Sequence, residues 1–155
     1  MSLLHASAER TIPAPADAVY ALLADYRNGH PHILPPAFSD LTILRGGVGA
    51  GTEIRFSLEL AGRRDVVEAS VDEPEPGRVL SETYPQRSAV TRFTVDPVGS
   101  QSRVRIETTW KSSRGLGGLI ERIVAPRLFR KLYAEELDLI ERWATERDSG
   151  RTPDD

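Results

Sequence analysis

The sequence contains no cysteine among its 155 residues, which excludes disulfide bonds, thiol nucleophiles and cysteine-ligated zinc. It also lacks any apolar run near the ~20 residues that a membrane-spanning helix needs. Its N-terminus has neither the basic stretch nor the apolar segment of a secretory signal peptide. We therefore expect a cytoplasmic protein without a membrane span.

The chain also has no large excess of charge of either sign, because 20 basic and 23 acidic residues give a net charge of −3. A dedicated nucleic-acid-binding protein would carry a basic face, so no nucleic acid is expected as a partner. The sequence has no G-x-S-x-G and no H-E-x-x-H motif, which leaves hydrolase chemistry without support. No cofactor and no metal are predicted.

Glycine, in contrast, is concentrated in the stretch LRGGVGAGTEIRF at residues 44–56. A phosphate-binding loop needs a lysine after its last glycine and a helix that follows. Here Thr52 follows the last glycine directly, and residues 53–60 alternate apolar and polar side chains as a strand does. The pattern favours a hairpin over a nucleotide site, because glycine adopts positive φ angles without steric cost.

Segments of strand-like alternation separated by short turns fill the middle of the chain, which is typical of an antiparallel meander. The six segments are 40–45, 52–60, 65–73, 79–84, 89–97 and 103–110. A further strand is predicted at 3–12, and a helix led by Pro15 at 13–26. The glycine- and proline-rich segment 27–38 favours a loop with a short helical turn.

The last third of the chain has helical periodicity over residues 115–147. Pro126 interrupts it, and the apolar stripes before and after this residue point in different directions, so two helical pieces are predicted. We expect one domain over residues 1–147 and a flexible polar tail at 148–155. The fold class is therefore α+β, with a curved seven-stranded antiparallel sheet packed on a long C-terminal helix.

This order of elements resembles the helix-grip superfamily, to which START lipid-binding domains belong, and in particular its bacterial polyketide cyclase/dehydrase-like branch. The segments that carry the resemblance are TIPAPADAVYALLADYRNGHPHILP, GGVGAGTEIRFSL, VDPVGSQSRVRIETTW and GLGGLIERIVAPRLFRKLYAEELDLIERW. The residues themselves predict two short helices between the first and second strands. The resemblance implies a cavity for an apolar ligand between the sheet and the last helix.

Residues on the inward faces of the strands and helix are therefore candidate ligand-binding residues, although most would also suit an ordinary core. We select Phe56, Leu58, Val67, Glu82, Thr91, Phe93, Thr108, Trp110, Leu132 and Tyr133. Thr91 and Thr108 are chosen because a hydroxyl on an inward face can hydrogen-bond a ligand carbonyl. Glu82 shares one strand face with Leu80 and Tyr84, but Val79 argues for the opposite face.

Glu136 is the most informative polar residue, because it alone among the charged residues after Pro126 lies within the apolar half of the helix. Burial of a carboxylate is unfavourable unless it is paired, hydrogen-bonded or protonated. Two interpretations are open. Glu136 is either paired in the core with an arginine or tyrosine, or it faces the cavity with a raised pKa.

His30 and His32 flank Pro31 in the loop after the first helix, where the resemblance places part of the cavity mouth. They make a poor metal site because no third histidine or cysteine completes it. They are either solvated loop residues or, near a ligand, an acid/base group that titrates close to neutral pH.

The leading functional hypothesis is a binding protein, monomeric or homodimeric, for a small hydrophobic molecule such as a polyketide, lipid or isoprenoid-like compound. An alternative is an aldol-type cyclase or dehydratase in which Glu136 is the base and Tyr84 or His30 the proton donor. A third is a protein-interaction module, which predicts a filled cavity and an exposed apolar patch on residues 115–124.

Overall fold

The structure is a computed structural model that describes residues 3–112 and 116–148, with side chains described from residue 124 onward in the second range. The strands are β1 Leu3–Ile12, β2 Phe38–Arg45, β3 Glu53–Leu60, β4 Arg63–Glu75, β5 Val79–Tyr84, β6 Ala89–Val98 and β7 Gln101–Lys111. The helices are α1 Ala16–Ala24 and α2 Leu116–Asp148, with 3-10 turns η1 His30–Ile33 and η2 Pro85–Arg87. The predicted tail beyond residue 148 lies outside the described residues.

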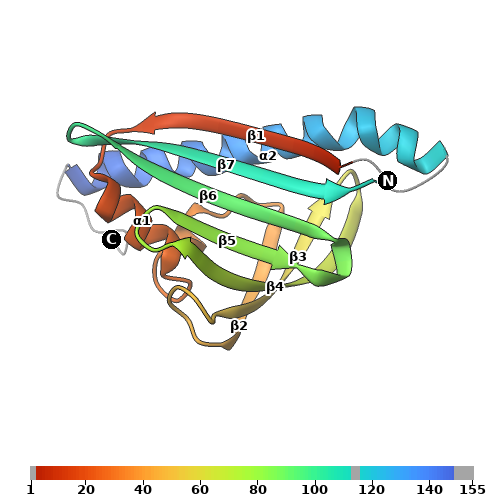
Figure 1. Cartoon of the computed structure of the whole chain (residues 1–155), viewed down its shortest axis with the longest axis horizontal. Coiled ribbons are helices and arrows are strands. Elements are labelled where there is room, and N and C mark those ends of the chain that lie inside the picture. The colour runs from red at the N-terminus through yellow and green to blue at the C-terminus, as the bar shows by residue number, and fades with distance from the viewer. Residues whose placement is uncertain (1–2, 113–115, 149–155) are drawn as a thin grey trace.

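The seven strands form one antiparallel sheet in the order β1-β7-β6-β5-β4-β3-β2. Consecutive strands from β2 to β7 are neighbours, and β1 closes the order by pairing with β7. Figure 1 shows the sheet curving around the long helix α2, which runs along its far side. The α+β class, the meander and the two short helical segments before β2 are confirmed.

The core lies between the concave face of the sheet and α2. Cross-strand pairs such as Phe93 with Ile106 and Val95 with Val104 supply buried apolar side chains at every second position. The helix contributes Leu137 to this core, with Ile140 and Ala144 on the same face at helical spacing. Alternation along the strands therefore placed the inward face correctly.

The expectation that Pro126 divides the C-terminal helix is wrong. A single helix of 33 residues, α2, runs through this position. Proline removes one N–H donor and costs ~3 kcal/mol, but the other turns of so long a helix keep their hydrogen bonds. Packing of α2 along β1 and η1 outweighs this penalty.

The glycine-rich segment joins β2 to β3, as predicted, and its backbone pairs with the end of α1. The Tyr26 N–H donates to the Gly47 carbonyl at 2.9 Å, and the Gly49 N–H donates to the Ala24 carbonyl at 2.9 Å. Gly47 has a φ of 146°, and a Cβ there would lie 2.1 Å from Nε of Arg27. Glycine thus permits two chain segments to approach closely, and this contact positions the residues that follow α1.

Neither α1 nor the described part of α2 combines the length and apolar character that crossing a membrane would require.

Candidate functional site

A cavity of about 520 Å³ lies between the sheet and α2. All the candidate residues from the sequence line it, with the exception of Phe93. It is also lined by residues that were not selected, including Leu34, Phe38, Leu41, Ile54, Leu60, Ala89, Leu128 and Phe129. The walls are therefore mainly aliphatic and aromatic, and the polar groups are few.

Phe93 is a correction to the predicted ligand contacts. It lies on the inward face, as alternation requires, but it is fully buried in the core and is not part of the cavity wall. Its ring meets the His30 imidazole edge-on, with 5.6 Å between ring centroids. His30 lines the cavity in this region instead, and strand alternation carries no information about a residue contributed by a loop.

Glu82 of β5 accepts hydrogen bonds from two tyrosines. The Tyr26 hydroxyl donates to Oε1 at 2.7 Å, and the Tyr84 hydroxyl donates to Oε2. The face shared by Leu80, Glu82 and Tyr84 is therefore the inward one. Val79 is also buried, because the first four residues of β5 are all buried, and for this reason alternation did not separate the two faces.

Tyr26 is a site residue that the sequence reasoning missed. The predicted helix at 13–26 includes it, but α1 ends at Ala24 and Tyr26 lies beyond it. Its ring stacks on His30 with 4.4 Å between centroids, and its side chain is buried. Burial and the neighbouring Glu82 raise the pKa values of Tyr26 and Tyr84 well above the ordinary tyrosine value, so both phenols remain protonated donors.

His30 is buried, whereas His32 on the other side of Pro31 is exposed. The solvated-loop interpretation therefore holds for His32 and is wrong for His30. Nδ1 of His30 lies 2.8 Å from the Leu23 carbonyl, which can only accept, so Nδ1 carries the proton. Nε2 then faces Oε1 of Glu82 at 3.7 Å. Burial lowers the pKa of His30 against the opposing effect of Glu82, so the imidazole is neutral at pH 7.

Glu136 faces the same region from α2 and is 3 % exposed. Its Oε2 is buried and has no hydrogen-bond partner among the residues that the structure describes. Burial, followed by the nearby Glu82 charge, raises the pKa of Glu136 well above the ordinary glutamate value. This direction is the one expected for the cavity-facing interpretation, and it favours the protonated form of Glu136.

A chain of hydroxyl groups connects three elements beside these carboxyl groups. Thr91 of β6 and Thr108 of β7 are hydrogen-bonded with 2.6 Å between their oxygens. Thr108 is also hydrogen-bonded to the Tyr133 hydroxyl of α2. Both threonines and the tyrosine line the cavity, so their hydroxyls add further polar positions to its interior.

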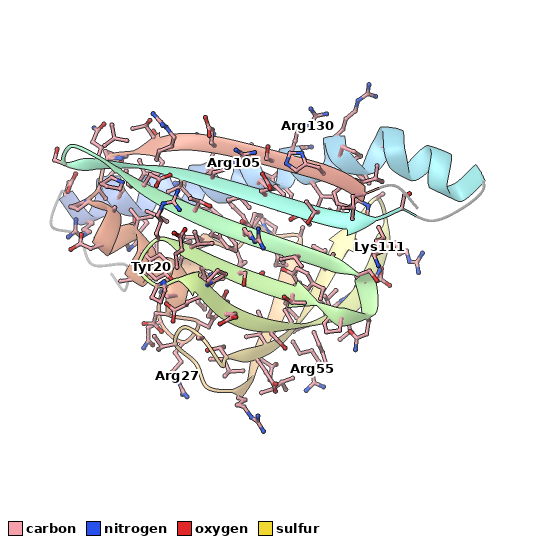
Figure 2. All side chains as sticks on the ribbon, in the orientation of Figure 1. Tyr20, Arg27, Arg55, Arg105, Lys111 and Arg130 are labelled. Carbon is pink, nitrogen blue, oxygen red and sulfur yellow. The ribbon has the colours of Figure 1, made fainter. Side chains whose placement is uncertain are left out.

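The mouth of the cavity is formed by exposed and half-buried residues from three turns and strand ends. Arg63 and Asp65 follow the β3–β4 turn, Arg87 lies in η2, and Lys111 ends β7. Figure 1 shows these three places at one end of the sheet, opposite α1, and Figure 2 labels Lys111 there. The sequence reasoning did not select these residues, because they are far apart in the chain and lie outside the apolar alternation.

No group of three metal-ligating side chains occurs within residues 3–112 and 124–148. The interaction-module hypothesis predicts a filled interior, whereas the structure has a cavity of about 520 Å³. The apolar patch expected on 115–124 lies outside the described side chains, except for Val124, which is exposed.

The curved sheet, the long helix packed against its concave face and the cavity between them define a helix-grip protein. Residues 4–144 match the sequence family described as polyketide cyclase / dehydrase and lipid transport, and the chain belongs to this family.

Solved structures agree with this assignment. The KanY protein, determined by NMR, is 32% identical, with a TM-score of 0.81 over 94% of this chain and 99% of its own. The ZhuI aromatase/cyclase from Streptomyces sp. R1128 is 18% identical, with a TM-score of 0.77 over 97% of this chain and 100% of its own. Norcoclaurine synthase from Thalictrum flavum is 17% identical, with a TM-score of 0.72 over 95% and 97%. The last two share the fold. No curated protein sequence matches the chain.

Proposed function

We propose that the protein binds a small, mainly apolar molecule that carries a carbonyl or hydroxyl group, of the polyketide, lipid or isoprenoid type. The observation that carries the proposal is Glu136, which lines an apolar cavity of about 520 Å³ and whose buried Oε2 lacks a partner among the described residues. A buried polar atom without a partner is unfavourable, and a ligand group that hydrogen-bonds to it relieves this cost.

The chemistry of the wall supports one arrangement of such a ligand. The apolar body contacts Phe56, Leu58 and Leu132, where burial of apolar surface contributes most of the affinity. The polar group lies toward Glu136, whose protonated carboxyl donates to a carbonyl oxygen. Glu82 is less available, because both of its oxygens already accept hydrogen bonds from tyrosines.

The neutral fluorescent probe N-phenyl-1-naphthylamine tests cavity binding directly. We expect its emission to rise on addition of the protein and this rise to be lost in Leu58→Trp, which places a larger side chain in the cavity. Val66→Trp is the matched control, because Val66 is an exposed residue on the adjacent strand β4. Absence of binding, or equal binding by both variants, would contradict the proposal. Native mass spectrometry of protein purified gently from its host then searches for the natural ligand.

A second candidate function is an aldol-type cyclisation or dehydration. It is favoured by two groups that line the same cavity: the Glu136 carboxyl, whose raised pKa favours the protonated form, and the His30 imidazole, whose lowered pKa favours the neutral form. The aromatase/cyclase among the structural neighbours is consistent with it. The roles expected from the sequence are Glu136 as the base and His30 as a proton donor. The pKa shifts reverse these roles, because the pKa of Glu136 is raised and that of His30 is lowered. Glu136 then acts as the acid that protonates oxygen, and Nε2 of His30 is the candidate base.

Retro-aldol cleavage of 4-hydroxy-4-(6-methoxy-2-naphthyl)butan-2-one tests this second function, because it releases a fluorescent aldehyde. The base removes the hydroxyl proton, the carbon–carbon bond breaks, and the acid protonates the ketone oxygen to give an enol. Glu136→Gln can still hydrogen-bond the ketone but cannot transfer a proton. We expect its rate to fall at least ~100-fold with unchanged probe binding. A parent rate equal to that in buffer would argue for binding without catalysis.

A further inference from the structure

Resting on the proposed cavity-binding function, we propose that the mouth of the cavity selects ligands with an anionic group, such as a carboxylate or sulfonate, at the end opposite to Glu136. The ligand class is thus an amphipathic anion that lies with its charged group at the mouth, its apolar body along the cavity and any neutral polar group inside.

The charges at the mouth are unbalanced. Among the exposed and half-buried lining residues that the structure describes, Asp65 is the sole carboxylate. It interacts with two arginines, since Nε of Arg63 lies 3.4 Å and Nη2 of Arg87 lies 3.3 Å from its Oδ2. Lys111 forms no ion pair with any described residue. Three cations therefore share one carboxylate.

The backbone holds these cations close to one another. The Lys111 N–H donates to the carbonyl of Ser88 at 3.3 Å, which brings the end of β7 against the residue after Arg87. The shared contact with Asp65 ties the β3–β4 turn to η2. Because the side chains of Arg63, Arg87 and Lys111 are exposed, they can reorient toward an anion at the mouth without losing burial.

The inner end of the cavity, in contrast to the mouth, has no excess of positive charge among its described lining residues. Its titratable lining groups are Glu82, Glu136 and His30, joined by the phenols of Tyr84 and Tyr133. None of these supplies a positive charge at pH 7, because the imidazole is neutral. An anion is therefore disfavoured inside and favoured at the mouth, and this asymmetry fixes the orientation of the ligand.

Two probes with the same apolar body separate this inference from the proposed function. The anionic 8-anilinonaphthalene-1-sulfonate differs from neutral N-phenyl-1-naphthylamine by its sulfonate alone. For Arg87→Gln/Lys111→Gln we expect the Kd of the anionic probe to rise about three- to tenfold, the range of exposed charge pairs, while that of the neutral probe changes less than about twofold. Asp65→Asn removes the competing carboxylate and should lower the Kd of the anionic probe.

The matched control is Arg92→Gln/Arg103→Gln, which makes the same change of net charge with exposed residues that do not line the cavity. We expect no selective change in this variant. In the parent protein, raising the salt concentration should weaken binding of the anionic probe and leave binding of the neutral probe unchanged. The inference is overturned if the control and mouth variants behave alike, if both probes respond in parallel, or if Leu58→Trp leaves binding of the anionic probe intact. Binding of neither probe to the parent overturns the proposed function itself.

Discussion

The strand β5 and the helix α2 each place one glutamate in the same cavity, but the two carboxyl groups differ in their hydrogen bonds. Both oxygens of Glu82 accept a tyrosine hydroxyl, from Tyr26 and from Tyr84. Oε2 of Glu136 has no partner among the described residues, although both side chains are similarly buried. Glu82 is therefore held by the fold, whereas Glu136 remains available to a ligand.

The difference shows that burial alone does not identify a functional carboxyl group. A buried polar side chain whose hydrogen bonds are complete belongs to the structure, because its removal leaves partners unsatisfied. A buried group with an unsatisfied atom on a cavity wall costs stability, and binding of a ligand offsets that cost. Substitutions on the two sides should consequently have opposite effects on stability and on binding.

The largest expected effect on stability is that of replacing Glu82 in β5. Glu82→Ala removes the acceptor of two buried tyrosine hydroxyls, and we expect a loss of ~3 kcal/mol or more in the free energy of unfolding. Urea unfolding monitored by circular dichroism measures it. Glu68→Ala, at an exposed position of the adjacent strand β4, is the control and should cost less than ~1 kcal/mol. Equal losses in the two variants would show that the tyrosine bonds to Glu82 contribute little.

Tyr26→Phe should have the next largest effect, because it deletes one hydrogen bond to Glu82 and keeps the stacking on His30. We expect a loss of ~2 kcal/mol in the free energy of unfolding. The same substitution in the Glu82→Ala background should have a much smaller effect, because the acceptor is already absent. Additive losses in this double-mutant cycle would contradict the assigned contact.

A smaller effect on the free energy of unfolding is expected from the protonation of His30, which makes stability depend on pH. Burial lowers its pKa in the folded state, so the unfolded chain binds the proton more readily. The free energy of unfolding should therefore decrease as the pH falls below ~6.5, the value of a free histidine. Urea unfolding from pH 7.5 to pH 5 measures this slope, which should be reduced in His30→Gln. The His32→Gln control should keep the parent slope, since His32 is exposed.

At acidic pH, the smallest expected change in stability is that of Glu136→Gln. The raised pKa of Glu136 means that its contribution to stability is lost as the pH rises past ~4.3, the unfolded value, toward the folded one. The variant should therefore match the parent within ~0.5 kcal/mol at pH 4 and be at least as stable at pH 8. A loss near 3 kcal/mol at pH 8 would instead indicate a paired carboxylate.

The sequence predicted the sheet, and it predicted the inward face of β4, β6 and β7, because alternation persists along these three strands. Glu136 was also predicted, since a charged residue within an apolar helical stripe is visible without a structure. The partners of Glu82 were not predicted as a group. Tyr26 and His30 come from the segment after α1, and its path is set by backbone bonds to the glycine loop. No local sequence pattern predicts such a contact between distant segments.

The mouth of the cavity was missed for a related reason. Arg63, Arg87 and Lys111 belong to three separate turns and strand ends, and charged residues at such places are ordinary on any protein surface. Their proximity follows from the pairing of distant strands. Pro126 shows the converse: a strong local signal for a helix break does not end α2, which packs against β1 and η1.

The most direct test of the account is the carbon-13 NMR titration of the Glu136 carboxyl in protein labelled with [5-¹³C]glutamate, with the signal assigned by its absence in Glu136→Gln. We predict a pKa well above that of free glutamate and a change in chemical shift when the neutral ketone 2-acetylnaphthalene is added. An ordinary pKa would contradict the claim that Glu136 is a buried, protonated acid. A signal unmoved by saturating ketone would contradict its role as the polar anchor of the cavity.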